Sequence, residues 1–500
     1  MASTPRNQYR SGSIRVSEVR TTVSPPTGGA ASRRLRRARA STSAASKLLP
    51  LPAASRRLVS WPRLTYAYTV AGFTPRRRAA SRVVIRRSPC ASLMTHRVHI
   101  LIQSTLTVIQ SIMDGRCMNT TVDVPRGLAG VVVTETALGD VRGREGFYHY
   151  RQYSAVELAE RRSFEDVWHL MFRGELPADA AGRAAFAAEI APLRRLSAEV
   201  AGALPALARA TAASGPLAGL RTALSLLGAS AGFRPLYDLA PERRAADALA
   251  ACAAVPTLLT ALYRLGRGLE PVAPRDDLPY AANYLYMLTG QEPDPAAARA
   301  IEQYLVSTVD HGFNASTFTA RVIASTGADV AACLTGAIGA LSGPLHGGAP
   351  SRALDTLDAI GTADRIEPWI RERVLAGDRI MGFGHPVYRT EDPRSRMLRG
   401  IALGFGGPLV DFAVQVESHV ERILAELKPG RELHTNVEFY AGVVMELCGL
   451  PRAMFTPTFC AARVVGWSAN VLEQAADSKI IRPAARYAGP TPPRPVPAPA

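Results

Sequence analysis

The sequence contains no run of about 18 uncharged apolar residues, which is the length that a membrane-spanning helix requires. Its longest candidate, residues 98–113, is interrupted by polar side chains such as Gln103 and Gln110. Cysteine is also scarce, and the six residues are scattered without any C-x-x-C spacing. This pattern argues against a disulfide framework or a zinc site and favours a reducing compartment. We therefore expect a cytoplasmic protein that is not integral to a membrane.

Acidic residues are almost absent from one end of the chain. Residues 1–112 carry nineteen arginines, one lysine and a single acidic residue, Glu18. The remainder, 113–500, holds 39 basic and 41 acidic residues, so the overall net charge of +17 arises entirely from the N-terminal end. The body of the protein thus lacks the electrostatic footprint of a nucleic-acid-binding domain, and we expect no nucleic-acid partner.

The basic N-terminal segment shows no sustained helical or strand period, and its Arg, Ser, Ala and Pro content predicts disorder over 1–117. Three explanations remain open. It resembles an organellar targeting peptide in composition, although it is long for one. It could be a basic arm for nucleic acid. The interpretation that we favour is a false start, with Met113 or Met118 as the natural one, because lysine occurs only three times against 56 arginines and such usage suggests G+C-rich coding.

The body reads as helical almost throughout. Residues 131–134 and 146–150 predict short strands around a turn at Gly139-Asp140. After Ser154, helix starts are indicated by Ser163, with Asp166 three residues on, and by Asp294-Pro295. The predicted fold class is all-α with a minor N-terminal β hairpin.

A short motif at residues 228–232 matches the G-x-S-x-G nucleophile elbow. That elbow requires a strand before the serine and a helix after it. The preceding segment, 220–227, is rich in alanine and leucine and has a helical pattern. We therefore interpret the motif as small residues at a helix end and not as a serine hydrolase site.

Three histidines lie in glycine-rich turns, where glycine permits a close approach of a ligand to the backbone. They are His311 in DHGFN, His346 in GPLHGG and His385 in GFGHP. None shows the i, i+4 pairing or the nearby cysteine that is typical of a metal site, so no metal is expected. Together the three turns indicate a binding or catalytic site.

The C-terminal third supplies a carboxylate and several arginines. Asn436 reads as a helix N-cap that places Glu438 in the first turn, where the helix dipole favours the ionised form. Arg394, Arg463 and Arg482 are candidates for bidentate binding of carboxylates. Taken alone, each arginine is better interpreted as a solvated surface charge.

These residues fall within segments that resemble the citrate synthase family. Residues 382–394 (GFGHPVYRTEDPR) are similar to the family signature at every constrained position. Residues 310–317 (DHGFNAST), 343–348 and 436–442 (NVEFYAG) resemble its other landmarks in the same order, and the resemblance covers about 120–490. A branch called citrate synthase 2, or citrate/methylcitrate synthase, is similar.

The resemblance implies a mostly helical homodimer whose large and small domains close over oxaloacetate and acetyl-CoA. By position, the large domain would comprise 118–347 and 447–500, with the small domain inserted at 348–446. The implied activity is an acyl transfer that forms citrate and CoA in the tricarboxylic acid cycle of a bacterial cytoplasm. The family needs no metal or redox cofactor.

The resemblance also assigns roles. Glu438 matches the base, His346 the donor to the thioester carbonyl, and His385 the residue that polarises the oxaloacetate carbonyl. We expect the helix that follows His346, starting near Pro350, to keep its ring neutral. The implied oxaloacetate ligands are His311, Asn314, Arg394, Arg463 and, from the partner subunit's chain, Arg482; the implied CoA ligands are Met381, Gly382, Phe383, Gly384 and Asn436.

One position departs from the family pattern, because the usual base is Asp and this chain has Glu438. The longer side chain shifts the carboxylate, and a misplacement of about 1 Å can cost some hundredfold in rate. We expect a site rebuilt around glutamate. Two alternatives stay open: a 2-methylcitrate synthase that uses propionyl-CoA, and a catalytically weak paralogue with a binding or regulatory role.

Overall fold

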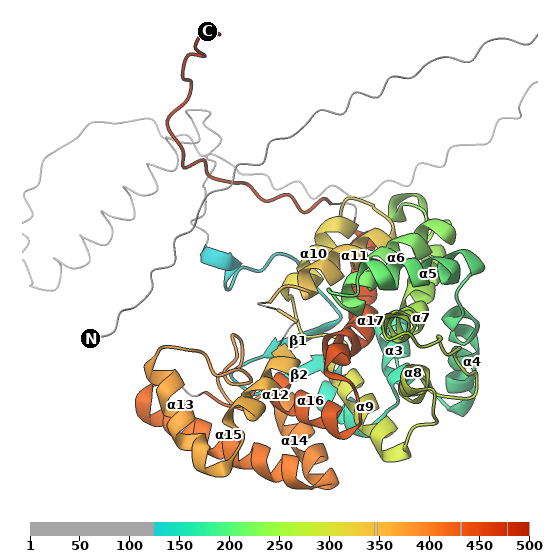
Figure 1. Cartoon of the computed structure of the whole chain (residues 1–500). Coiled ribbons are helices and arrows are strands. Elements are labelled where there is room, and N and C mark those ends of the chain that lie inside the picture. The colour runs from blue at the N-terminus through green and yellow to red at the C-terminus, as the bar shows by residue number, and fades with distance from the viewer. Residues whose placement is uncertain (1–124, 345, 348, 431–432, 478, 500) are drawn as a thin grey trace, which may run out of the picture. The chain divides into compact units, whose positions relative to one another are not determined.

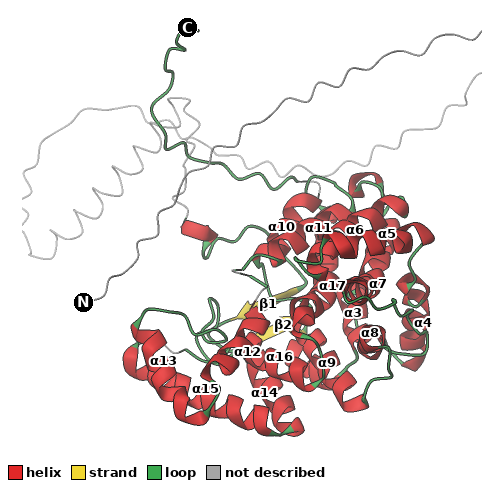
Figure 2. Ribbon diagram, viewed as in Figure 1, coloured by secondary structure: helices red, strands yellow, loops and turns green. Residues whose placement is uncertain are grey.

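The computed structural model describes residues 125–344, 346–347, 349–430, 433–477 and 479–499 (Figure 1). All of them belong to one compact unit. The disorder and the false start expected for 1–117 lie outside the described residues. The helical fold class predicted from the sequence is confirmed, since helices dominate the described chain (Figure 2).

A small antiparallel sheet precedes the helices. It contains three strands in the order β1 (Gly139–Arg142), β2 (Phe147–Tyr150) and β3 (Tyr153–Ser154). Gly139 pairs with Tyr150 and Arg142 with Phe147, so the hairpin turn lies at 143–146. The sheet buries Tyr148 and Tyr150 of β2, whose hydroxyls donate to the carbonyl oxygens of Ser307 and Val306. These contacts fix the hairpin on the end of a helix.

The first predicted strand and its turn are wrong. Residues 131–134 form no strand, and Val132 is 84% exposed. The expected turn at Gly139-Asp140 is instead the start of β1. β-branched residues favour an extended backbone, but a strand also needs a pairing partner and a buried face. Here the buried face of β2, which carries Tyr148 and Tyr150, fixes β2 on the protein, and the segment that pairs with it is β1 and not 131–134.

The helices before the small-residue turn at 343–347 pack into one bundle around a buried core (Figure 1). Short 3-10 turns at Arg126–Leu128, Pro192–Arg194 and Leu236–Asp238 connect parts of this region. Its helices are α2 (Ala155–Arg161), α3 (Phe164–Arg173), α4 (Ala180–Ile190), α5 (Ala198–Ala210), α6 (Pro216–Ser230), α7 (Pro241–Gly266), α8 (Tyr280–Thr289), α9 (Pro295–Thr308), α10 (Ala315–Ala324) and α11 (Val330–Leu341).

A second group of helices follows, and Figure 1 shows α13, α14 and α15 (orange) set apart from α3 to α8. The last helix returns to the bundle, where it packs against α7 and α10. Short 3-10 turns occur at Ala363–Arg365 and Arg452–Met454. The helices are α12 (Ala349–Ile360), α13 (Ile366–Leu375), α14 (Pro393–Phe405), α15 (Pro408–Leu427), α16 (Val437–Leu447) and α17 (Phe455–Ala476).

The helix starts expected from the sequence are confirmed. The Ser163 hydroxyl accepts a hydrogen bond from the backbone N–H of Asp166 at 3.1 Å, and Asp294 accepts from Ala297 at 2.9 Å with proline next in the chain. The segment 228–232 ends α6 at Ser230 and is not a strand-to-helix elbow. Local capping chemistry therefore set these boundaries.

The central helix α7 is long and apolar enough to cross a membrane by length and composition, with a mean hydropathy of 1.7 over its most apolar window. However, 83% of that window is buried inside the protein. It packs against α5, α6, α8 and α17. A helix that is apolar on all sides is expected at the centre of a bundle, and α7 occupies that place.

Candidate active site

The structure brings two of the three predicted histidine turns into direct contact. His311 follows α9, and His385 lies in the loop before α14. Their ring centroids are 5.5 Å apart, and Tyr388 contacts both rings. The Tyr388 hydroxyl is 2.9 Å from His311 Nε2, and Arg394 Nη2 is 3.3 Å from His385 Nε2. These residues form one polar cluster.

His385 is held in a defined tautomer. Its Nδ1 accepts hydrogen bonds from the backbone N–H groups of Val387 at 3.0 Å and Tyr388 at 3.1 Å. In the neutral ring the proton must therefore be on Nε2. Burial lowers the pKa of His385 to about 4, and the charge of Arg394 lowers it further, whereas Asp392 opposes the shift. The ring is thus a neutral donor near pH 7.

His346 is also neutral near pH 7. Its Nε2 is 2.8 Å from the Ser316 hydroxyl, which in turn accepts from Trp467 Nε1 at 3.1 Å. Burial lowers the pKa of His346 to about 4, and the Arg463 charge adds to the effect. The expected helix near Pro350 is present as α12. Burial and the Arg463 charge are sufficient causes of the lowered pKa of His346, and the contribution of that helix stays a prediction.

Two buried guanidinium groups line this region. Arg394 is 3% exposed and pairs with Asp392 through Nε at 3.0 Å and Nη2 at 2.8 Å. Arg463 is 2% exposed, donates to the Thr308 carbonyl at 2.7 Å and lies over the Phe459 ring. Both lie inside the protein, so the reading of solvated surface charges is wrong for them. Buried guanidinium groups suit planar anions such as carboxylates.

Glu438 begins α16 as expected. Its N–H donates to the Asn436 side-chain oxygen at 3.1 Å, which confirms the N-cap. Burial raises the pKa of Glu438 to about 7, although Arg394 and, more weakly, Arg352 act in the opposite direction. The net shift is opposite to the one that the helix dipole favours, because removal from water is the largest cause. A carboxyl group with a pKa near 7 is suited to act as a general base.

Asp392 connects the arginine to the base helix. Its carboxylate accepts from both Arg394 nitrogens and also from the N–H of Val437, the residue before Glu438, at 3.1 Å. Although burial favours its neutral form, Arg394 holds the pKa of Asp392 below its usual range. One ionised carboxylate thus fixes the position of Arg394 relative to Glu438.

The loop at 381–384 packs against the start of the same helix. Phe383 and Thr435 form an isolated antiparallel bridge, and Asn436 donates through Nδ2 to the Gly384 carbonyl at 3.0 Å. Gly382 has φ +87, and a Cβ there would lie 3.0 Å from Phe439. This position therefore requires glycine, and the predicted CoA-binding segment lies beside Glu438.

Comparison with known proteins gives a consistent result. Residues 127–484 match the family model described as citrate synthase, C-terminal domain. The citrate synthase of Deinococcus radiodurans is 38% identical over 369 residues, 73% of this chain and 96% of that protein. The 2-methylcitrate synthase of Mycobacterium tuberculosis is 39% identical over 367 residues, 73% of this chain and 91% of that protein.

The chain belongs to the citrate synthase family. It is therefore an enzyme of the acyltransferase class, and the family expected from the sequence motifs is confirmed. Among solved structures, the citrate synthase of Thermoplasma acidophilum in a ternary complex with carboxymethyl coenzyme A and oxaloacetate has a TM-score of 0.68. It is 26% identical and covers 74% of this chain and 97% of that one.

Two residues that the citrate synthase resemblance assigned to oxaloacetate have other surroundings in this structure. The Asn314 side-chain oxygen caps α10 by accepting from Thr317 N–H at 3.1 Å, and it competes with His346 Nε2 for the single proton of the Ser316 hydroxyl, which lies 2.8 Å from each. Arg482 is exposed in the C-terminal segment after Ile481, whose N–H donates to Ser325 at 3.1 Å. Asn314 therefore shapes the turn after His311, and the role of Arg482 stays a prediction.

Sequence reasoning missed three contributors to this citrate synthase site. Tyr388 and Asp392 lie within the signature stretch, and Ser316 lies within DHGFNAST, so all three were inside recognised motifs. Their contacts with His311, Arg394 and His346 could not be read from spacing along the chain. Among the residues that the structure describes, no cluster of three His, Cys, Asp or Glu side chains could hold a metal ion.

Proposed function

We propose that the protein condenses acetyl-CoA with oxaloacetate and water to give citrate and CoA. The Glu438 carboxylate takes a proton from the thioester methyl group, and His346 donates a hydrogen bond to the thioester oxygen as the enol forms. The enol carbon attacks the oxaloacetate carbonyl, whose oxygen receives the proton of His385 Nε2. Water then hydrolyses citryl-CoA, and the sulfur leaves as the CoA thiol. Glu438 releases its proton to solvent and His385 Nε2 takes one up from solvent, which restores both groups.

One observation supports this proposal: burial raises the pKa of Glu438 to about 7 and lowers those of His346 and His385 to about 4, and the charge of Arg394 acts on both Glu438 and His385. A base that is half ionised near pH 7 and two neutral donors are what enol formation and carbonyl attack require. Arg394, Arg463 and His311 would bind the oxaloacetate carboxylates, as buried guanidinium groups suit them. The proposed reaction uses no metal or redox cofactor.

Binding of acyl-CoA is assigned to the loop from Met381 to Gly384, with Asn436. The support is its contact with Thr435 and Asn436, which directly precede α16, the helix that carries Glu438 in its first turn. The Thermoplasma acidophilum relative, with carboxymethyl coenzyme A and oxaloacetate, supports the same pair of substrates. We also propose a large domain of 118–347 and 447–500 and a small domain of 348–446, which close over both substrates.

A homodimer is part of the proposal. Arg482 would bind oxaloacetate in the site of the partner subunit, which agrees with its exposed place in its own chain. We propose a bacterial cytoplasmic location, on the absence of a C-x-x-C spacing or disulfide pattern in the sequence. Organellar targeting by the basic N-terminal segment is the alternative.

A 2-methylcitrate synthase is the second candidate function. It is supported by the 39% identity to the Mycobacterium tuberculosis 2-methylcitrate synthase, which is about the same as the 38% identity to the Deinococcus radiodurans citrate synthase. One extra methylene is worth about 1–3 kcal/mol of discrimination, and the shape of the acyl pocket decides its sign.

The test is thiol release that depends on oxaloacetate, with acetyl-CoA and propionyl-CoA in parallel. A kcat/KM ratio in favour of acetyl-CoA supports the citrate synthase, and the reverse ratio supports the second candidate. Glu438→Gln should lower turnover with both. Glu446→Gln, eight residues along the same helix and paired with Arg452 at 3.4 Å, is the matched control and should retain it. Oxaloacetate binding without thiol release would indicate the weak paralogue instead.

A further inference from the structure

The tip of the β1–β2 hairpin lies directly against the loop that carries His385. The backbone N–H of Arg389 donates to the Gly143 carbonyl at 2.9 Å. A Cβ on Gly143 would lie 2.2 Å from the Val387 carbonyl oxygen and 2.7 Å from its carbon. No side chain fits between two backbones at this separation. Any residue other than glycine at position 143 would push the hairpin and the loop apart.

The backbone that Gly143 touches is the one that holds the His385 ring. Val387 and Tyr388 each donate a backbone N–H to His385 Nδ1, at 3.0 and 3.1 Å. The Tyr388 hydroxyl is also the partner of His311 Nε2 at 2.9 Å. A displacement of the loop at Val387 would therefore change the donors to one histidine and the contact of the other.

We propose that the hairpin tip at Gly143 is a positioning element for His385, which keeps the Val387 and Tyr388 N–H groups on Nδ1 and the imidazole proton on Nε2. This inference rests on the proposed function, in which Nε2 donates to the oxaloacetate carbonyl. Gly143 itself touches neither substrate nor reacting atom, so its effect is transmitted through the loop.

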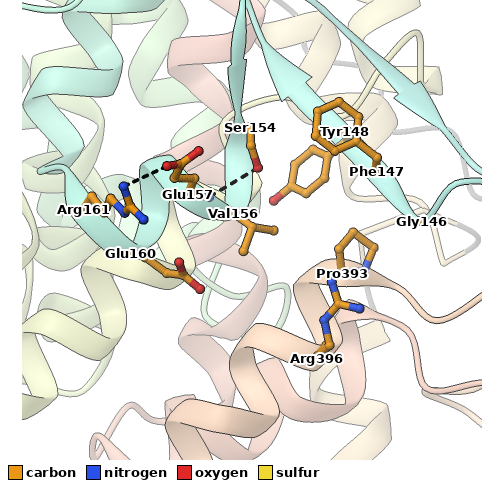
Figure 3. A pocket seen from close by; sticks show the side chains of 10 residues that line it. All are labelled: Gly146, Phe147, Tyr148, Ser154, Val156, Glu157, Glu160, Arg161, Pro393 and Arg396. Carbon is orange, nitrogen blue, oxygen red and sulfur yellow. Dashed lines mark hydrogen bonds and ion pairs between the residues drawn. The ribbon is translucent and has the colours of Figure 1, made fainter.

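The space beside the hairpin agrees with this assignment. A cavity of about 270 Å³ lies between Phe147 and Tyr148 of β2 and Pro393 and Arg396 of α14. Figure 3 shows Pro393 and Arg396 on the wall opposite Ser154 and Glu157. Side chains do not fill this space, so side-chain packing there does not hold the hairpin at a fixed distance from the chain at Pro393. The backbone contact at Gly143 therefore helps to set that distance.

The charged surroundings predict how the imidazole responds when the loop moves. Burial, then Arg394, and also Arg389, lower the pKa of His385, while Asp392 raises it. On the hairpin, Arg142 pairs with Asp140 and with Glu145, so the charges there largely compensate one another. If the two N–H donors leave Nδ1, that atom can take a proton, and the pKa of His385 rises toward its ordinary value.

The test compares Gly143→Ala with Gly139→Ala. A Cβ on Gly139 would also lie 2.2 Å from a carbonyl oxygen, that of His149, but this clash is inside the hairpin and not with the loop. Both variants thus place a methyl group 2.2 Å from a backbone carbonyl oxygen, and they differ in whether that oxygen belongs to the loop that holds His385. Nitrogen NMR of histidine-labelled protein reports the tautomer and pKa of His385, and kinetics report KM for each substrate.

We expect Gly143→Ala to raise the oxaloacetate KM and to lower kcat/KM by about tenfold to a hundredfold, the cost of a misplacement of about 1 Å. The acyl-CoA KM should change little, and the His385 pKa followed by NMR should rise from about 4, while the acid limb near pH 7, which Glu438 sets, should stay in place. Gly139→Ala should change kcat/KM less than about threefold. Equal effects of the two variants, or an unchanged His385 spectrum in Gly143→Ala, would overturn the proposal.

A further variant keeps the test decisive if Gly143→Ala does not fold. Val387→Ala removes two methyl groups, one of which would lie 2.9 Å from a Cβ on Gly143, and it adds no atom. A change of the His385 tautomer population in Val387→Ala supports the positioning role, and an unchanged population counts against it. Because the NMR measurement does not depend on turnover, failure of this inference is distinguishable from absence of thiol release in the wild-type protein.

Discussion

The pKa of Glu438 leads to a quantitative prediction about pH. Burial raises this pKa to about 7, and only the ionised carboxylate accepts a proton. The active fraction should therefore be about one tenth at pH 6, one half at pH 7 and nine tenths at pH 8. An exposed glutamate with its ordinary pKa would be ionised throughout this range and would give a flat profile.

Deuterium exchange from the acetyl-CoA methyl group, with an unreactive oxaloacetate analogue bound, isolates this step. His346 and His385 should not contribute above pH 6, because their pKa values are lowered to about 4. Asp310 is another acid in range, since burial raises its pKa to about 6 while Arg463 opposes the shift. Asp310→Asn should leave the fall of the exchange rate below pH 7 unchanged. Glu438→Gln should lower the exchange rate by at least about 10²-fold and abolish its dependence on pH in this range.

A flat wild-type profile between pH 6 and 8, or exchange at the wild-type rate in Glu438→Gln, would refute this reasoning. Glu438→Asp then addresses the departure from the family pattern. In a site rebuilt around glutamate, the shorter carboxylate stands too far from the methyl carbon and exchange falls. A rise in kcat would show instead that glutamate is a handicap in this chain.

Three more predictions follow from single features. Arg352→Ala should shift the acid limb of the exchange profile to higher pH, because this guanidinium lowers the pKa of Glu438. Arg482→Ala should raise the oxaloacetate KM. Mixed dimers of an Arg482→Ala subunit with an Arg463→Ala subunit should regain one intact site of two, measured as recovered activity. If no activity is recovered, Arg482 does not act in the partner's site. Deletion of residues 1–112, which lie outside the family match at 127–484, should leave turnover and thermal midpoint unchanged; aggregation or loss of activity would contradict this.

The helical fold and its family were predictable because the relevant signals are local. The caps at Ser163, Asp294 and Asn436 satisfy N–H groups two or three residues further along the chain, so sequence spacing alone indicates them. The prediction of a strand at 131–134 was wrong because strand formation depends on residues that are distant along the chain. Strand formation depends on a partner and a buried face, and neither is visible in a run of valines.

The candidate site was predicted in residue types but not in its electrostatics. The sequence placed His385, Arg394 and Glu438 in recognisable motifs. It could not show that Asp392 bonds to both Arg394 and the helix of Glu438, or that Tyr388 contacts His311. Those contacts join residues from different loops, and only packing brings them within hydrogen-bond distance.

The sequence by itself determined the helix boundaries, the glycine turns that hold the histidines and the family motif, since each depends on neighbours along the chain. The tertiary structure decided the protonation of the site. In the first turn of a helix Glu438 would be expected to ionise easily, yet burial raises its pKa to about 7. Desolvation and charge act through space, and Arg394 and Arg352 reach Glu438 only after α12, α14 and α16 have packed together.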